Sequence, residues 1–458
     1  MTLPDKNKVG IFLAALYILL QPLMLQNPLK PVLSHGLGSL QIADVLFPFM
    51  LVWMVWWLWG VVRSDSIRTS MSEHSTVFVA AGFLVAAFLL GGVGTAYSPR
   101  LLDLAKFGYL VGVLLFFTLA MNSVSAVTTV FRVLVYVSIG FMVVSIGYYF
   151  AALFFGYSSD FAQIREGFPY LGRVVRLNGP MQPTSKILGM YLLVLTLLLM
   201  LGKSLITPRV WWLAVILTMV CGLLTLGRVG VVATAAIIIG LASFSPNRLQ
   251  WISVMAIPLL TAALAIQALT VWHIDVAHFG LDCGADYAIK QQSQYFGWYG
   301  EPTICHFSMD SGVTYSSYFL MKLVALKAWF SQPLFGIGIY QYEHAWIEAA
   351  GVDIPIYFKD YPFTMAQSTY LTLLAEVGLF GFVAWFGLMG LFLRRIWVAL
   401  SQARPMRWML LSWGACFFYA LIDLDVQNFR FLYSLIPLAT GLSMHTASQH
   451  HLNKRVSE

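Results

Sequence analysis

Long apolar segments separated by short polar joints make up most of this chain. The segments are about 18–25 residues long, which is the length that an α-helix needs to cross roughly 30 Å of hydrocarbon. We predict about twelve membrane-spanning helices, with cores near residues 9–25, 41–62, 76–96, 104–121, 131–156, 184–202, 210–226, 229–244, 251–271, 367–393, 408–424 and 429–446. The pattern therefore predicts an all-α polytopic membrane protein, built as a single membrane domain over residues 1–458.

One polar stretch, residues 272–366, is too long to be a joint between neighbouring helices. It lies between the ninth and tenth predicted spans and forms one large loop on one side of the membrane. Within it, residues 318–330 are apolar except for Lys322 and Lys327, and they are too few to cross a bilayer. We expect this segment to be a helix that lies at the membrane interface.

Basic residues gather at every second joint, and this spacing predicts the orientation of the chain. The residues are Lys6, Lys8, Arg63, Arg68, Lys203, Arg209, Arg248, Arg394, Arg395, Arg404, Arg407, Lys454 and Arg455. Because loops rich in Lys and Arg stay in the cytoplasm, both termini are predicted to be cytoplasmic and the large loop extracytoplasmic. The composition agrees, with 59% hydrophobic and only 10% charged residues. The net charge of +7 is thus explained by membrane orientation, and we do not expect a nucleic-acid partner.

Four arginines lie on the opposite, outward side, against the trend: Arg165, Arg173 and Arg176 in one joint and Arg228 in the next tight turn. One interpretation is that they reach lipid phosphates at the membrane surface. The other is a bound anionic ligand, because the planar guanidinium fork matches phosphate oxygens. Four arginines from two neighbouring joints favour the second interpretation, and several in one region suit a diphosphate.

The cysteines separate into two kinds. Cys283 and Cys305 share the large outer loop, and such a pair can form a disulfide in an oxidising compartment. Cys221 and Cys416 fall within apolar spans and are expected to be ordinary buried side chains. No Cys-x-x-Cys or His-x-x-x-His spacing occurs, so we predict neither a metal site nor a cofactor.

Four short motifs occur in order along the chain. They are Arg176-Leu-Asn-Gly-Pro-Met-Gln-Pro-Thr184, Leu224-Thr-Leu-Gly-Arg228, Gln332-Pro-Leu-Phe-Gly-Ile-Gly338, and Gln367-Ser368 followed after nine residues by Gly378-Leu-Phe-Gly381. Together with the predicted topology they resemble the O-antigen ligase and O-antigen polymerase superfamily of integral-membrane bacterial glycosyltransferases. The resemblance implies a GT-C-like membrane fold in the bacterial inner membrane, with the active site facing the periplasm.

The resemblance also implies a reaction and its participants. The donor would be an undecaprenyl-diphosphate-linked glycan, the acceptor a glycan or a lipid, and the surroundings membrane lipids. In the family pattern a histidine stands where this chain has Gln367, and an amide does not titrate near neutral pH. This departure favours a polymerase that joins repeat units of O antigen or exopolysaccharide. A ligase that uses another base, such as His344, Glu343 or Asp360, stays open, and a polysaccharide or lipid transporter is the more distant alternative.

The same comparison assigns roles to individual residues. Arg176 and Arg228 are expected to bind the diphosphate, with Arg165 and Arg173 as further binders and Gln367 as a hydrogen-bonding group. An arginine that the family often carries early in the interfacial helix is missing here, and Lys322 is a candidate substitute. Tyr370 and Glu376 complete the expected substrate-binding set, although a buried structural role as the partner of an arginine is an equal alternative for Glu376.

Overall fold

The computed structural model describes most of the membrane domain. The described residues are 5–21, 42–62, 67–93, 101–159, 161–168, 172–179, 185–245, 247, 257–258, 260–261, 307–308, 314–315, 317–349, 365–401, 404–425 and 429–457. The predicted Cys283–Cys305 disulfide and Asp360 lie outside them, as does most of the ninth predicted span.

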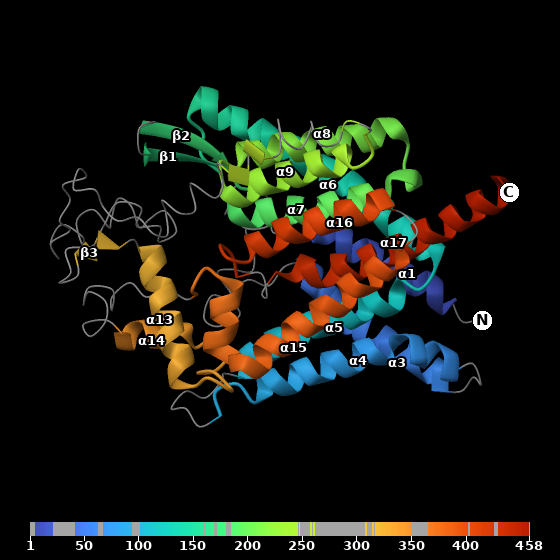
Figure 1. Ribbon diagram of the computed structural model, residues 1–458, viewed down its shortest axis with the longest axis horizontal. Helices are drawn as coiled ribbons and strands as arrows, with labels where there is room; N and C mark the ends of the chain where they lie inside the picture. Colours follow the sequence, from blue (N-terminus) through green and yellow to red (C-terminus); the bar gives the residue numbers. More distant parts are fainter. Residues whose placement is uncertain are drawn as a thin grey trace.

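Within these residues the protein is a bundle of long helices (Figure 1). Its main helices are α1 (Lys6–Leu20), α3 (Phe47–Val62), α4 (Ile67–Leu89), α5 (Leu101–Ala120), α6 (Val124–Phe155), α7 (Ser185–Leu201), α8 (Pro208–Leu224), α9 (Arg228–Ala242), α15 (Thr369–Ala399), α16 (Arg404–Ala420) and α17 (Arg430–Ser457). Eleven of the twelve predicted spans overlap one of these helices, and the four described residues of the span 251–271 are helical as well. The helical architecture is therefore confirmed, whereas the number of membrane crossings stays a prediction.

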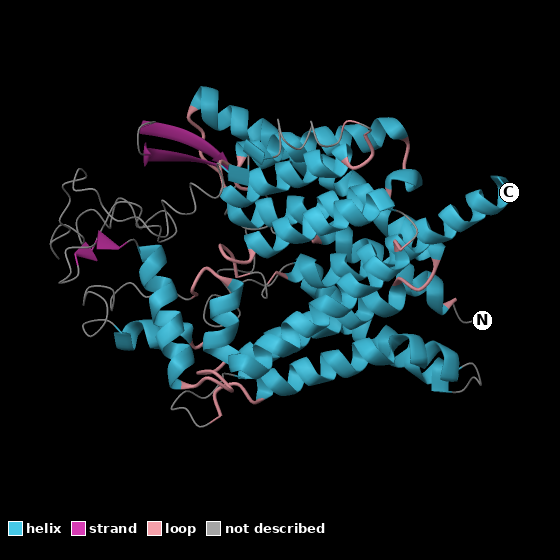
Figure 2. Ribbon diagram, viewed as in Figure 1, coloured by secondary structure: helices cyan, strands magenta, loops and turns pink. Residues whose placement is uncertain are grey.

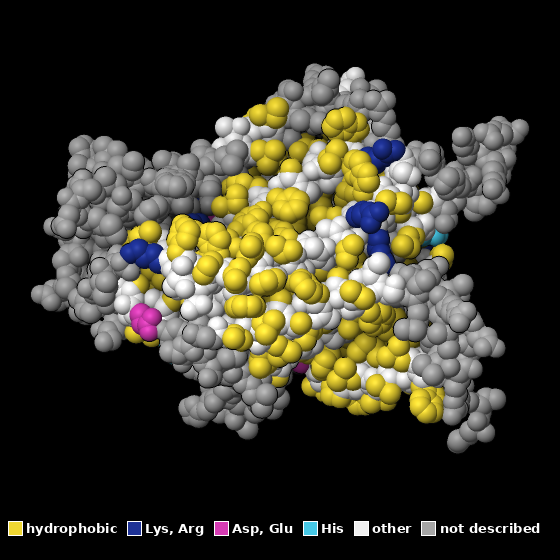
Figure 3. Space-filling model, turned by 60° about the horizontal axis from the view of Figure 1, so that its bottom comes forward, with side chains coloured by type: hydrophobic (Ala, Val, Ile, Leu, Met, Phe, Trp, Pro, Cys, Tyr) yellow, Lys and Arg dark blue, Asp and Glu magenta, His cyan; other side chains and the backbone are white. Residues whose placement is uncertain are grey.

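The outside of the bundle is apolar to a degree that is unusual for a protein in water. Large side chains such as Val52, Val79 and Phe154 are each at least 70% exposed. In Figure 3, hydrophobic side chains cover the middle of one face, with Lys and Arg side chains toward its two sides. Three helical segments, Ala43–Gly60, Val124–Phe155 and Thr369–Ala399, are long and apolar enough to cross a membrane. These features fit a helical membrane protein.

The two ends of the bundle differ. Both termini lie at one end, and the other end carries an antiparallel hairpin of β1 (Ala162–Phe168) and β2 (Gly172–Leu177) (Figures 1 and 2). The second end also carries α13 (Ser317–Ser331), α14 (Tyr342–Ala349) and the short pair β3 (Phe307–Ser308) and β4 (Thr314–Tyr315). Hereafter these are the terminal end and the hairpin end. The strands amend the all-α prediction, because the polar joints contain local β-structure.

The central helix of the bundle is α7. Every residue from Ser185 to Leu201 is buried except Lys186, as expected for a helix that is apolar on all sides. It lies closest to α9, because Gly189 lets the two backbones approach: a Cβ at this position would stand 2.7 Å from the Gly230 nitrogen. Small residues commonly allow such close helix packing in membrane proteins. This contact sets the first turns of α7 and α9 side by side at the hairpin end.

The third and fourth motifs meet in one backbone contact, which we name the glycine junction (residues 333–338 with 375–380). The Ile337 and Gly338 amides donate to the carbonyls of Ala375 and Glu376, each at 2.8 Å. Gly378 interrupts α15 with a φ of 63°, a conformation that favours glycine. A Cβ on Gly378 would overlap the Leu334 carbonyl. The junction fixes α13 against the first half of α15.

Candidate functional site

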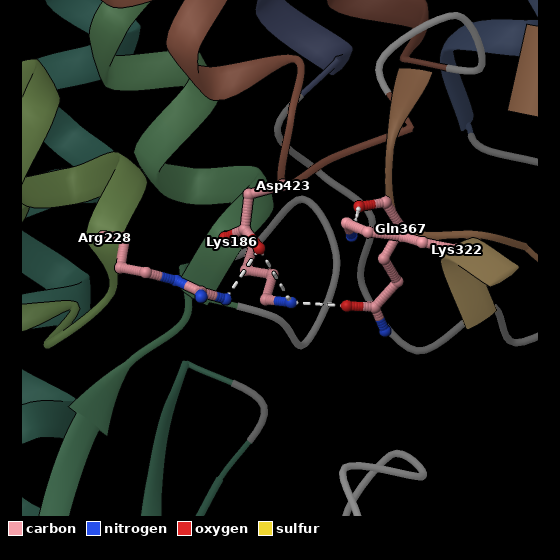
Figure 4. Close-up of polar contacts among 5 residues, drawn as sticks. All are labelled: Lys186, Arg228, Lys322, Gln367 and Asp423. Carbon is pink, nitrogen blue, oxygen red and sulfur yellow. Dashed lines mark hydrogen bonds and ion pairs between the residues drawn. The ribbon is translucent and has the colours of Figure 1, made fainter. Parts of the chain in front are cut away.

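A cluster of charged and polar side chains lies at the hairpin end (Figure 4). Its members are Lys186 at the start of α7, Arg228 at the start of α9, Lys322 of α13, Gln367 just before α15, and Asp423 between α16 and α17. They come from five separate parts of the chain. The helix packing described above is what brings them together.

Asp423 is the centre of this cluster. One of its carboxylate oxygens accepts from Nη2 of Arg228 at 2.6 Å and lies 4.0 Å from Nζ of Lys186. The Lys186 ammonium also donates to Oε1 of Gln367 at 2.5 Å. Arg228 is 8% exposed and Asp423 is 1% exposed, so water provides little solvation for either charge. A charge buried in this way needs an oppositely charged partner, and a single carboxylate here serves two cations.

Lys322 approaches the cluster from α13. Its Nζ donates to the backbone carbonyl of Gln367 at 3.2 Å. Gln367 has a φ of 50°, which is uncommon for a residue with a side chain and indicates that its surroundings hold it in place. Burial lowers the pKa of Lys322 to about 8, against the opposing effect of the nearby Asp423 carboxylate. Lys322 therefore changes its protonation state close to physiological pH, which an ordinary lysine does not.

Asp425 ties the start of α15 to the connection between α16 and α17. Its carboxylate accepts hydrogen bonds from the Thr372 hydroxyl and from the backbone amides of Gln367 and Ser368. Burial raises its pKa, and these hydrogen bonds oppose the rise. The Thr369 amide donates to the carbonyls of Leu421 and Leu424 at 2.9 and 2.8 Å. Asp425 thus satisfies donors that a helix N-terminus leaves open, and it holds Gln367 in position.

Arg176 extends the cluster from the end of β2. Its Nε donates to the Thr225 carbonyl at 3.1 Å, and Nη2 lies 3.5 Å from where a Cβ on Gly227 would stand. Arg176 is buried and lies against the turn that carries Arg228. The first and second motifs are therefore neighbours at the hairpin end. The diphosphate that they were expected to share stays a prediction.

The other predicted residues lie around this cluster or outside the described side chains. Arg165 and Arg173 belong to β1 and β2, where the backbone of Arg165 faces Val174 and that of Arg173 faces Glu166; their side chains are outside the described part of the structure. Cys221 and Cys416 are buried free thiols, as predicted.

Tyr370 and Glu376, both predicted to bind substrate, lie in the first half of α15. The ring of Tyr370 stacks on Phe386 at 5.3 Å and its hydroxyl donates to the Phe418 carbonyl at 3.0 Å, so the side chain lies between α15 and α16. Glu376 is 5% exposed and belongs to the glycine junction.

Glu343 and His344 are partly exposed on α14, next to the buried Tyr342. The contacts drawn in Figure 4 do not include them.

The observed α13 differs from the predicted interfacial helix in one respect. The helix is present where it was predicted, but its two lysines differ: Lys327 is exposed, whereas Lys322 turns toward Gln367. The same helix packs against its neighbours through the buried side chains of Leu320, Val324 and Ala325. Contact with α15, and not the membrane interface alone, therefore determines how α13 lies.

Sequence reasoning missed two residues of the cluster, Lys186 and Asp423, and the neighbouring Asp425. A signal for them exists in the chain. Asp423 and Asp425 stand at the outer end of the predicted span 408–424, on the same side as the four outward arginines, and Lys186 lies just inside the span 184–202. Acidic residues at that side are the natural partners of outward cations.

The arrangement suits an anion. Lys186, Arg228 and Lys322 lie near the carboxylates of Asp423 and Asp425. Arg176 lies against the turn that carries Arg228, so four basic side chains gather around two acidic ones. Three helices, α7, α9 and α15, also begin here, and helix N-termini carry partial positive charge. Within the described residues no three His, Cys, Asp or Glu side chains gather as metal ligands.

No protein-family model matches the sequence, and comparison with curated proteins finds no significant match. The chemistry of the cluster and the motifs it joins are therefore the basis on which a function is proposed.

Proposed function

We propose that this protein is a polymerase-type membrane glycosyltransferase. It would join oligosaccharide units carried on undecaprenyl diphosphate at the periplasmic face of the bacterial inner membrane. The observation that carries the proposal is the buried excess of cations around Arg228 and Asp423, at the end of the bundle opposite both termini. In the proposed orientation about twelve helices span the membrane, the termini are cytoplasmic and the hairpin end faces the periplasm.

The packing of the four motifs supports the resemblance on which the proposal draws. Arg176 of the first motif contacts Thr225 of the second. The third and fourth motifs exchange backbone hydrogen bonds at the glycine junction. Gln367 of the fourth motif is linked through Lys186 and Asp423 to Arg228 of the second. Short motifs that matched by chance would have no reason to lie together in this way.

The chemistry of the cluster fits a lipid diphosphate donor. When the sugar leaves, negative charge develops on the diphosphate, and preorganised cations stabilise that charge best in a site with little water. Arg176 and Arg228 offer planar donor forks for phosphate oxygens, and Lys186 adds a point charge beside them. These side chains take the neutralising role that a metal ion has in other enzymes, so we propose a metal-independent reaction.

A transfer assay with the protein in lipid nanodiscs tests the proposal. The substrate is an oligosaccharide on undecaprenyl diphosphate, and gel electrophoresis separates products by chain length. The wild type is expected to lengthen the lipid-linked chain. Arg228→Lys keeps the charge and its attraction to Asp423 but loses the fork, so transfer should fall by about 10²-fold. Arg209→Lys, an exposed change at the start of α8, is the matched control and should leave transfer unchanged.

Each alternative gives a different result in this assay. Transfer only to an added lipid acceptor, with no chain lengthening, identifies a ligase. Movement of the donor into sealed vesicles without any new glycosidic bond identifies a transporter. Equal activity of the wild type and Arg228→Lys contradicts the assignment of Arg228 to the diphosphate.

A further inference from the structure

The proposed reaction requires a proton acceptor, and the described contacts indicate where it lies. The attacking group is a hydroxyl of the acceptor, which becomes a better nucleophile when a base takes its proton. Gln367, which hydrogen bonds two lysines, cannot serve because its amide does not titrate near neutral pH. The candidates for the base are therefore the ionisable groups of the cluster and its neighbours.

The neighbours of Lys322 differ from those of the other basic residues in the cluster. Arg228 is paired with Asp423 at 2.6 Å, and Lys186 lies between Asp423 and the Gln367 amide. Lys322 instead donates to a neutral backbone carbonyl, that of Gln367. Its amine can keep this hydrogen bond when it loses a proton, because a neutral amine still has two N–H groups and gains a lone pair. Arg228 cannot do so, since guanidinium does not deprotonate in proteins.

We propose that the amine of Lys322 is the base that takes the proton from the attacking acceptor hydroxyl. This inference rests on the proposed function. In the step, the acceptor oxygen forms a bond to the anomeric carbon of the donor sugar while its proton passes to Nζ of Lys322. The bond from that carbon to the diphosphate oxygen breaks, and the electron pair leaves with the diphosphate beside Arg176 and Arg228. The resulting ammonium returns its proton to water before the next transfer.

The protonation of Lys322 supports this role. Its pKa of about 8 leaves a useful fraction of neutral amine near pH 7. Asp423 and Asp425 favour the ammonium, whereas Lys186 and Arg228 disfavour it. A bound diphosphate would add negative charge and raise this pKa.

The helices packed on α13 bring further ionisable groups. Glu376 comes from α15, and Tyr342, Glu343, His344 and Glu348 come from α14. Variants that differ only at Lys322 keep all of these groups. Any pH dependence of transfer that remains in Lys322→Met therefore belongs to them and not to Lys322.

The other candidate bases are already engaged. The Asp423 carboxylate binds Arg228 at 2.6 Å and lies 4.0 Å from Nζ of Lys186. Asp425 accepts from Thr372 and from the start of α15. The Tyr342 hydroxyl donates to the Met321 carbonyl at 2.6 Å, and burial raises its pKa well above the usual value.

The pH dependence of kcat/KM tests the proposal, with the full chain in nanodiscs and the lipid-diphosphate donor. For the wild type, kcat/KM should rise roughly tenfold per pH unit below the pKa of about 8 and then level off. Lys322→Met and Lys322→Arg should both lose about 10²–10⁴-fold, the latter because it keeps the charge without a titratable amine. Lys322→His should retain measurable transfer with its rise moved toward about pH 6.5. Lys327→Met, an exposed change on the same helix, should match the wild type.

A second measurement does not depend on activity. Competitive acetylation across a pH series, followed by mass spectrometry, yields the pKa of each lysine in the folded protein. The pKa of Lys322 is expected near 8. Lys322→Arg with wild-type rates, or a Lys322 amine with the pKa of an unperturbed lysine, about 10.4, overturns the proposal while the transfer activity of the wild type still stands. A wild type with no transfer at any pH overturns the proposed function and this inference together.

Discussion

Asp423 and Gln367 hold the cluster together through different contacts. Asp423 neutralises the buried Arg228, and Gln367 accepts from Lys186 with its side chain and from Lys322 with its backbone. The contact to Lys322 therefore does not depend on which side chain stands at position 367. Only the position of that carbonyl matters, and Asp425 sets it by accepting from the Gln367 amide. This explains how the chain can lack a histidine at this position and keep a titratable group beside it.

Gln367→Ala should accordingly have a smaller effect than loss of a lysine. The change removes the hydrogen bond to Lys186 and leaves the carbonyl that binds Lys322. Alanine and glutamine both carry a Cβ, so the energetic cost of the positive φ at this position is similar for the two residues. Losing one hydrogen bond to a charged group costs about 1.5–3 kcal/mol at most, part of which water replaces, so we expect about a tenfold loss of transfer. The nanodisc assay measures it beside Lys322→Met. A loss as large as that of Lys322→Met would show that the amide itself takes part in the reaction.

The glycine junction explains how α13 is held over the site. Gly378 breaks α15, so the first half of that helix can bind the backbone of residues 333–338. Gly336, with a φ of 68°, is packed against the Glu376 backbone so closely that it has no room for a Cβ. The turn that follows α4 also contacts this junction, because the Gly92 amide donates to the Phe335 carbonyl at 3.3 Å. The turn after α4, the segment after α13 and the helix α15 thus meet through backbone atoms. These contacts fix α13 and therefore the position of Lys322.

Gly378→Ala should destabilise the protein. At the φ of 63° and ψ of −166° of Gly378, a residue with a Cβ loses about 1–3 kcal/mol, and the overlap with Leu334 adds to this cost. Gly387→Ala is the control in the same helix, because its added Cβ would meet nothing within 4 Å. It should be neutral or stabilise by up to about 1 kcal/mol, since alanine favours helix. Thermal denaturation in detergent, followed by size-exclusion chromatography, measures both. Equal midpoints for Gly378→Ala and the wild type would contradict a structural need for glycine.

The two ends of the bundle carry different sets of charged residues. Two arginines at the starts of helices have acidic partners: Arg228 of α9 pairs with Asp423, and Arg430 of α17 pairs with Asp44 at 2.5 Å. Basic residues of the predicted cytoplasmic joints lie toward the terminal end, where Arg395 of α15 reaches Thr76 of α4. An apolar surface lies between the two ends and is suited to lipid.

Reporter fusions test this orientation. Green fluorescent protein fused after Glu458 should fluoresce, because it folds in the cytoplasm. Alkaline phosphatase fused after Ser159, next to the β1–β2 hairpin, should be active, because it requires the oxidising periplasm. A phosphatase fusion after Asn122, between α5 and α6, should be inactive and serves as the control. The reverse pattern of reporter activity would show the opposite orientation in the membrane, with the cluster on the cytoplasmic side.

The sequence by itself determined the helices and the two ends of the bundle. Both are local properties: a bilayer of fixed thickness demands an apolar segment of matching length, and basic residues at each joint record its side. The helix at 317–331 was also predictable from its apolar run, although not the strands β1 and β2, which occupy a polar joint with weak periodicity. Arg176 and Arg228 could be singled out because each stands on the side where arginine is unusual.

Only the tertiary structure decided which residues make the site. Lys186, Lys322 and Asp423 are far apart in the chain, and no local pattern records that α7, α13 and the α16–α17 connection meet. Their neighbourhood depends on side-chain volumes at helix contacts, such as Gly189 against Gly230, and on the break at Gly378. The orientation of Lys322 is the clearest case. Its sequence context predicts a lysine at the membrane surface, but packing against α15 turns it inward, where burial changes its chemistry.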